Sequence, residues 1–169
     1  MSLKYIEYEK VEAVKPEWLW SGSIRLGRVT LITGMGGVGK STLTYKIAAA
    51  VTTAAPLLGQ NSALLPPSYC IIQNSEDEPF EDTLPQLEQL GADISKIRTI
   101  GADGEQLTLL DSRFEEAVAE LGAKLLVIDP YTTFLGRTSM YSPQSIRSAL
   151  NHLQEIAQRH KCAVLLVVT

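Results

Sequence analysis

The chain has 169 residues, of which 45% are hydrophobic and 20% charged, a composition typical of one folded, soluble domain rather than a disordered protein. Its net charge of -4 and pI near 5.2 argue against a protein that coats nucleic acid with its whole surface. Cys70 and Cys162 lack metal-site spacing, so we expect buried, reduced thiols. Neither a signal peptide nor a membrane span is recognisable, which predicts a cytoplasmic protein with no membrane contact.

Short apolar runs alternate with helical patterns along the chain, which predicts a parallel α/β sheet. Strands are expected over residues 28–33, 69–74, 97–100, 124–128 and 162–169. Helices are expected over about 40–54, from Pro79 to Gly91, from Asp111 or Ser112 to Gly122, and from Ser142 and Pro143 onward. The first of these helices is expected to bury one face made by Leu43, Ile47, Ala50, Val51 and Ala54.

A glycine-rich loop follows the first of these strands and opens the first helix. Its sequence, GMGGVGKS, fits G-x-x-x-x-G-K-[ST] without a mismatch. Glycines let backbone amides face a polyphosphate, and the helix N-terminus adds partial positive charge. We expect Lys40 to reach the β- and γ-phosphates and Ser41 to ligand Mg²⁺. The predicted nucleotide-binding residues are Gly34, Met35, Gly36, Gly37, Val38, Gly39, Lys40, Ser41 and Thr42.

Acidic residues follow two of the other predicted strands. Asp129 ends the apolar strand 124–128 at the carboxyl edge of the sheet, where it is expected to hold Mg²⁺ together with Ser41. Hydrolysis also needs a group that orients the attacking water, and Glu76, directly after strand 69–74, is the best candidate. Asp77 is the next candidate, although an acidic helix N-terminus also explains it. The predicted catalytic residues are therefore Lys40, Glu76 and Asp129.

Several segments occur in the order and spacing of a known family: the glycine-rich loop, Ser75 to Asp77, Thr83 to Leu87, Ile128 to Pro130 and Arg147 to Leu150. Together they resemble RecA-like, AAA-type ATPases related to the RepA-type hexameric replicative helicases of plasmids and phages. The resemblance extends from about residue 16 to residue 169. It implies a three-layer α/β P-loop NTPase with a mainly parallel sheet, in which strand 163–168 lies between the P-loop strand and the Asp129 strand. Residues 1–27 would lead into and pack on a single ATPase core spanning 28–169.

The same resemblance implies function and partners. It implies Mg²⁺-dependent ATP hydrolysis, with Glu76 activating water, in a homo-oligomer that forms a hexameric ring. Single-stranded DNA would face the loop from Gly136 to Pro143, where Arg137 would bind phosphate and Tyr141 would stack on a base, although a solvated loop also explains these residues.

The chain also departs from this family. A polar sensor after strand 163–168, an arginine supplied to the neighbouring subunit and one further strand beside 28–33 are all expected beyond Thr169. These departures predict an incomplete core with strand 28–33 at an open edge.

Other functions remain open. A nucleotide-dependent switch that binds a protein partner without motor activity is the main alternative, and the absence of DNA-stimulated hydrolysis would favour it. Partitioning ATPases are disfavoured because Met35 occupies the position of their signature lysine, and a small-molecule kinase is disfavoured because no arginine cluster is present. Trp18 and Trp20 are expected to be core or interface anchors rather than base-stacking platforms.

Overall fold

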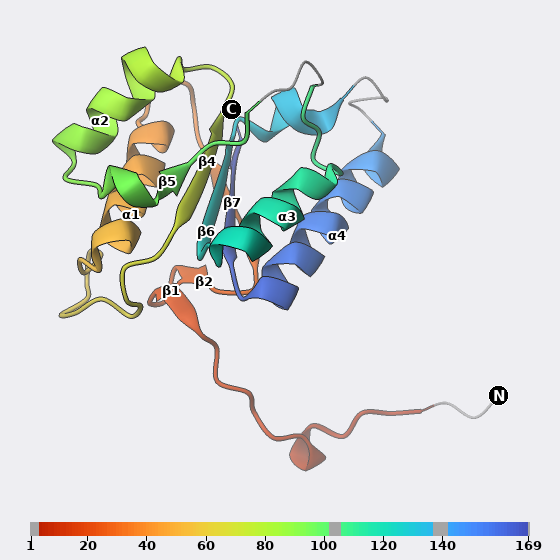
Figure 1. Ribbon diagram of the computed structural model, residues 1–169. Helices are drawn as coiled ribbons and strands as arrows, with labels where there is room; N and C mark the ends of the chain where they lie inside the picture. The colour runs from red at the N-terminus through yellow and green to blue at the C-terminus, as the bar shows by residue number, and fades with distance from the viewer. Residues whose placement is uncertain (1–3, 102–105, 137–141, 169) are drawn as a thin grey trace.

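The computed structural model describes residues 4–101, 106–136 and 142–168 and has one five-stranded parallel sheet at its centre (Figure 1). The order of the strands across this sheet is β3-β7-β6-β4-β5. Their bounds are Val29–Thr33 for β3, Ala163–Val168 for β7, Leu125–Asp129 for β6, Cys70–Asn74 for β4 and Ile97–Arg98 for β5. This order confirms that β7 lies between the P-loop strand and the Asp129 strand. Among the described strands, β3 pairs with β7 alone and lies at one edge of the sheet, with Leu31 54% exposed.

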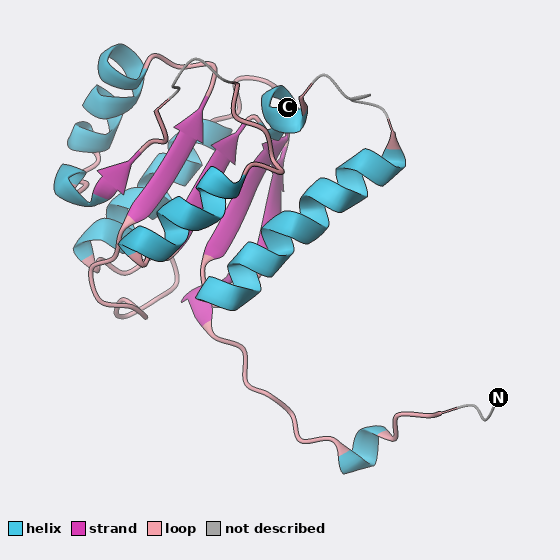
Figure 2. Cartoon of the chain, turned by 45° about the vertical axis from the view of Figure 1, so that its right-hand side comes forward, coloured by secondary structure: helices cyan, strands magenta, loops and turns pink. Residues whose placement is uncertain are grey.

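Helices cover both faces of the sheet, which confirms the three-layer α/β architecture (Figures 1 and 2). Helices α1 (Lys40–Thr53) and α2 (Leu84–Gln89) lie on one face, and α3 (Ser112–Leu121) and α4 (Pro143–His160) lie on the other. Short turns of helix join some of these elements: η2 (Pro79–Thr83), η3 (Ile94–Lys96) and η4 (Tyr131–Leu135). A further short turn, η1 (Tyr8–Lys10), lies before the sheet. No helix among the described residues is long and apolar enough to cross a membrane.

The core consists of two apolar layers because successive side chains of a strand point to opposite faces of the sheet. In β6, Leu125 and Val127 belong to the layer under α1 and α2, whereas Leu126 and Ile128 belong to the layer under α3 and α4. Cys70 and Cys162 are buried free thiols, one in each layer, as expected. Burial raises the pKa of Cys162 to about 12.

An antiparallel hairpin precedes the sheet. It pairs β1 (Trp18–Trp20) with β2 (Ile24–Arg25), and it buries Leu19 and Ile24 in the apolar layer on the α1 side. The indole of Trp20 donates a hydrogen bond to the Leu58 carbonyl at 2.9 Å, and both tryptophans are partly buried. Residues 4–16, in contrast, are exposed and run away from the sheet (Figure 2).

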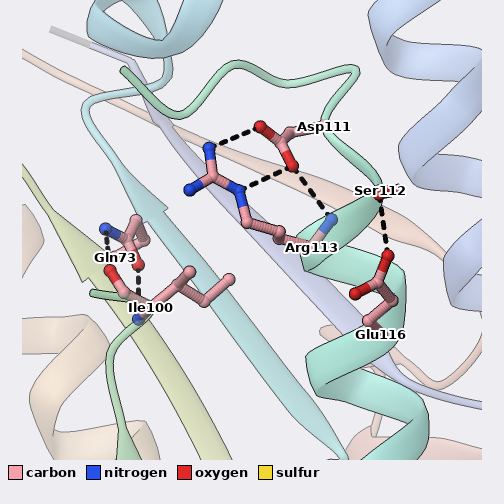
Figure 3. Close-up of polar contacts among 6 residues, drawn as sticks. All are labelled: Gln73, Ile100, Asp111, Ser112, Arg113 and Glu116. Carbon is pink, nitrogen blue, oxygen red and sulfur yellow. Dashed lines mark hydrogen bonds and ion pairs between the residues drawn. The ribbon is translucent and has the colours of Figure 1, made fainter. Parts of the chain in front are cut away.

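Two elements are shorter than the sequence pattern predicts. Strand β5 ends at Arg98 rather than at residue 100, because the side chain of Gln73 replaces the neighbouring backbone. Its Oε1 accepts a hydrogen bond from the Ile100 amide at 3.0 Å (Figure 3). Helix α2 begins only at Leu84, since residues Pro79–Thr83 form a π-helix with Pro79 in its first turn.

The predicted inner face of α1 is partly wrong. Leu43 is 37% exposed, while Tyr45 is completely buried in its place. The sequence did not show which side of α1 faces the core, because nearly every residue from Thr44 to Thr52 is buried, including both of these threonines. The buried positions therefore do not follow a single apolar stripe.

The start of α3 is set by local hydrogen bonds (Figure 3). Asp111 is the N-cap, and its Oδ1 accepts a hydrogen bond from the Arg113 amide at 3.0 Å. Ser112 donates to Glu116 one turn later at 2.8 Å. Gly122 ends the helix at a φ of 60°, a left-handed conformation that glycine adopts without a steric penalty.

Candidate nucleotide-binding site

The glycine-rich loop joins β3 to α1 at the carboxyl edge of the sheet. Gly37 and Gly39 have φ angles of 77° and 91°, which other residues rarely adopt, so the conformation of the loop requires glycine at both positions. A β-carbon added at Gly36, Gly37 or Gly39 would meet no atom within 4 Å, so this side of the loop is open to a ligand. Together these features leave the loop open to a ligand beside the N-terminus of α1.

The ammonium group of Lys40 lies over the beginning of this loop. Its Nζ donates hydrogen bonds to the carbonyl oxygens of Gly34 and Met35, both at 2.8 Å. Lys40 is partly buried and Thr42, two positions later, is exposed. The first turn of α1 therefore presents a cation beside the loop.

Ser41 and Asp129 meet at the same edge. The hydroxyl of Ser41 donates a hydrogen bond to Oδ2 of Asp129 at 2.6 Å, although the two residues are 88 positions apart in the sequence. Asp129 is the last residue of β6 and is 3% exposed. Burial raises the pKa of its carboxyl, with smaller contributions from the charges of Glu76 and Asp77. The Ser41 hydrogen bond and the charge of Lys40 act in the opposite direction.

This pair of oxygen ligands fits Mg²⁺. A buried carboxylate is costly unless a cation or hydrogen bonds compensate it, and Mg²⁺ prefers hydroxyl, carboxylate and phosphate oxygens. No group of three or more His, Cys, Asp or Glu side chains in residues 4–101, 106–136 and 142–168 is placed to hold a metal. An ion at this position would therefore rely on Ser41, Asp129 and the phosphates of a nucleotide.

The acidic segment after β4 lies beside Asp129. Asn74 pairs with Asp129 in the register of β4 and β6, and the Ser75 amide donates to the Asp129 carbonyl at 3.0 Å. The carboxylate of Glu76 is exposed and has no hydrogen bond or ion pair to any described residue. Asp77 differs, because its Oδ2 accepts hydrogen bonds from Tyr45 at 2.9 Å and from Asn74 at 3.0 Å. Of the two neighbouring carboxylates, Glu76 is the one left free.

Sequence reasoning missed the residues that hold this segment in place: Tyr45, Asn74 and Thr83. Asn74 was detectable, since asparagine at the end of a strand commonly hydrogen-bonds the backbone two residues on. Tyr45 carried a weaker signal, because a tyrosine hydroxyl that is buried needs a partner.

Other sequence candidates fall elsewhere. Arg137 and Tyr141, the candidate DNA contacts, lie outside the described residues. Arg147 is exposed on α4. His160, not proposed as a site, contacts Glu115 through Nε2 at 2.9 Å between α4 and α3.

A comparison with protein-family models agrees with this geometry. A model described as an AAA domain, a family of P-loop ATPases that bind nucleotide, matches residues 5–168. A search of curated proteins found no match.

Proposed function

Because the chain belongs to the AAA domain family of P-loop ATPases, we propose that it binds ATP with Mg²⁺ and hydrolyses it where β3, β4 and β6 end. One observation carries this proposal: the 2.6 Å hydrogen bond between Ser41 at the start of α1 and the buried Asp129 at the end of β6. It joins the phosphate-binding helix to the strand that carries the proposed magnesium ligand, although the two residues are 88 positions apart in the sequence.

In the proposed site, the phosphates lie on the loop and the first turn of α1. The backbone amides from Gly34 to Gly39 cradle them, and the ammonium of Lys40 moves from the Gly34 and Met35 carbonyls to the β- and γ-phosphates. Thr42, exposed on the same turn, completes the nucleotide contacts. Lys40 thereby exchanges two neutral acceptors for charged ones, which form stronger hydrogen bonds.

Ser41 and Asp129 would hold Mg²⁺. When bound, the ion would neutralise charge that develops on the phosphate oxygens. Asp129 is suited to this role because its raised pKa results mainly from burial, and a neighbouring cation favours the ionised form.

Glu76 is proposed to orient and deprotonate the attacking water. Its carboxylate is exposed beside Asp129 and engaged with no other described side chain. Asp77, in contrast, is occupied by two hydrogen bonds. We therefore prefer Glu76 to Asp77 as the general base.

Steady-state hydrolysis of Mg²⁺-ATP by the purified chain tests this proposal. Lys40→Ala is expected to lower kcat/KM by at least about 100-fold, since it removes a preorganised positive charge from the phosphates. Glu76→Gln is expected to lower kcat by about 100-fold or more while nucleotide affinity stays within about twofold. Turnover that survives both substitutions would contradict the proposal. Glu78→Gln, a nearby exposed carboxylate, is the matched control and should retain activity.

We further propose that this ATPase belongs to a replicative helicase or primase-helicase of plasmid or phage type and assembles into a homohexameric ring. Support comes from the resemblance carried by Ser75 to Asp77, Thr83 to Leu87 and Arg147 to Leu150. In such a ring, an arginine from a neighbouring subunit would stabilise transition-state charge, so hydrolysis by an isolated protomer would be slow.

Single-stranded DNA distinguishes the motor from the switch. Hydrolysis that depends on Lys40 and rises several-fold with single-stranded DNA would support the helicase. Native mass measurements with ATP should then show a hexamer. Nucleotide-dependent association with another protein, with no response to DNA, would favour the switch.

A further inference from the structure

A buried tyrosine of α1 reaches the acidic segment after β4. Tyr45 is completely buried, and its hydroxyl donates a hydrogen bond to Oδ2 of Asp77 at 2.9 Å. The hydroxyl oxygen of Tyr45 also accepts a hydrogen bond from Nδ2 of Asn74 at 2.8 Å and lies 3.3 Å from Oγ1 of Thr83. Because the phenol has one proton and two lone pairs, Thr83 must be the donor in this third contact. The hydroxyl therefore uses all of its hydrogen-bonding capacity on this segment.

Asn74 uses its whole amide group in the same place. Its Oδ1 accepts from the backbone amides of Glu76 at 2.8 Å and Asp77 at 3.0 Å. Its Nδ2 donates to Tyr45 and to Asp77. Asn74 thus fixes the turn that carries Glu76, and Tyr45 fixes Asn74.

The charges of this network are compatible with its burial. Desolvation, the main cause, raises the pKa of Tyr45 to about 12, so the phenol stays neutral and remains a donor. Asp77 receives two hydrogen bonds, which compensate the loss of water around its carboxylate. Asn74 and Asp77 are therefore held in place, while the Glu76 carboxylate between them has no hydrogen bond to any described residue.

The network also connects the two halves of the site. Lys40 and Ser41 lie on the first turn of α1, and Tyr45 lies on the next turn of the same helix. The Tyr45 hydroxyl therefore connects the phosphate-binding helix to the turn that carries Glu76.

We propose that Tyr45 is a positioning residue that, through Asp77 and Asn74, fixes Glu76 relative to the phosphate-binding helix. This inference rests on the proposed role of Glu76 in hydrolysis. It predicts that Tyr45 affects the chemical step rather than nucleotide binding, because the hydrogen bonds of the Tyr45 hydroxyl to described residues go to the acidic segment and the following Thr83, and none goes to the loop from Gly34 to Gly39.

Tyr45→Phe is the direct test, since it removes the hydroxyl and keeps the buried ring. We expect kcat for ATP to fall at least tenfold, because a small misplacement of a catalytic group is costly, while KM and nucleotide affinity stay within about twofold. Tyr69→Phe is the matched control. It removes a hydroxyl just before the same strand, β4, where no hydrogen bond to a described side chain is found, and should retain wild-type kcat.

A double-mutant comparison separates positioning from a general structural role. If Tyr45 acts through Glu76, Tyr45→Phe should have little further effect on kcat in a Glu76→Gln background. An equal loss of kcat in both backgrounds, or an unchanged kcat in Tyr45→Phe alone, would overturn the proposal.

Hydrogen exchange tests the positioning even if the proposed hydrolysis fails. In Tyr45→Phe, amide exchange at Glu76 and Asp77 should be at least about tenfold faster than in the wild type, because both amides bond to Asn74. Exchange in Tyr69→Phe should be unchanged. Unaltered exchange at these two amides would overturn the coupling, whereas wild-type turnover in Glu76→Gln would instead contradict the proposed function.

Discussion

The two faces of the sheet use buried side chains in different ways. The face under α1 and α2 carries buried hydroxyl groups from Thr44, Tyr45, Thr52 and Thr83. Each of these hydroxyls has a hydrogen-bond partner, and Tyr45 and Thr83 contact each other directly beside the acidic segment. The face under α3 and α4 is held by an apolar cluster, and the ion pairs that the described residues of these helices make, at Asp111 and Glu115, are partly exposed.

This difference suggests that one face positions particular side chains and the other stabilises the fold. Hydrogen-bonded networks fix particular groups in one arrangement, whereas apolar packing stabilises the fold through the area that it buries. We therefore expect substitutions under α3 to change the free energy of unfolding with little effect on kcat. Substitutions at the carboxyl edge should affect catalysis most.

The largest expected effect on stability is that of Phe114→Ala. Phe114 is completely buried at the start of α3, so its truncation should lower the free energy of unfolding by about 3–5 kcal/mol. Urea unfolding measures this change, and kcat per folded molecule should be unchanged. Phe80→Ala is the matched control, because Phe80 is 82% exposed and its truncation should cost less than about 0.5 kcal/mol. Equal destabilisation by the two changes would break the comparison.

Asp129→Asn should separate activity from stability at the carboxyl edge. We expect kcat/KM with Mg²⁺ to fall at least about 100-fold, since the carboxylate is lost. Without nucleotide, the same variant should be more stable than the wild type at neutral pH. The raised pKa means that the folded wild type binds the proton more tightly than the unfolded chain, so its stability falls as the pH rises above about 4.

The advantage of Asp129→Asn in unfolding free energy should therefore grow as the pH rises above about 4, until the pH exceeds the raised pKa of the folded carboxyl. Denaturant titrations of both proteins at several pH values measure it. A constant difference across this range would mean that the Asp129 carboxyl does not carry the raised pKa.

The sequence predicted some parts of the carboxyl edge and of α1 better than others. The loop from Gly34 to Ser41 and the strand ending at Asp129 were predictable, because each is a local pattern with its own spacing. The face of α1 was not, because polar Thr44 and Thr52 are buried together with the apolar residues between them, so the buried positions do not follow one apolar stripe. The network around Tyr45 was also inaccessible, because Tyr45 lies 29 to 38 residues before its partners and only the tertiary fold joins them.

A smaller effect is expected at the start of α3. Asp111→Ala removes the oxygen that caps the Arg113 amide and should lower the free energy of unfolding by about 1 kcal/mol. Asp111→Asn keeps a capping oxygen and should recover most of this loss, although it weakens the contact with the Arg113 guanidinium. If both variants were equally destabilised in urea, the ion pair rather than the cap would account for the role of Asp111.

The smallest effect should come from Glu115, which accepts hydrogen bonds from His160 and Arg159 between α3 and α4. The bond from His160, and then that from Arg159, holds the pKa of Glu115 below its usual range. A lowered pKa contributes stability above the unfolded value of 4.5, and this contribution is lost as the pH falls through the folded pKa.

Glu115→Gln should therefore lower the free energy of unfolding by less than about 1 kcal/mol at pH 7, because the group is partly exposed. The cost should shrink below about pH 4.5. A pH-independent cost at Glu115 would assign its contribution to packing between α3 and α4 instead of charge.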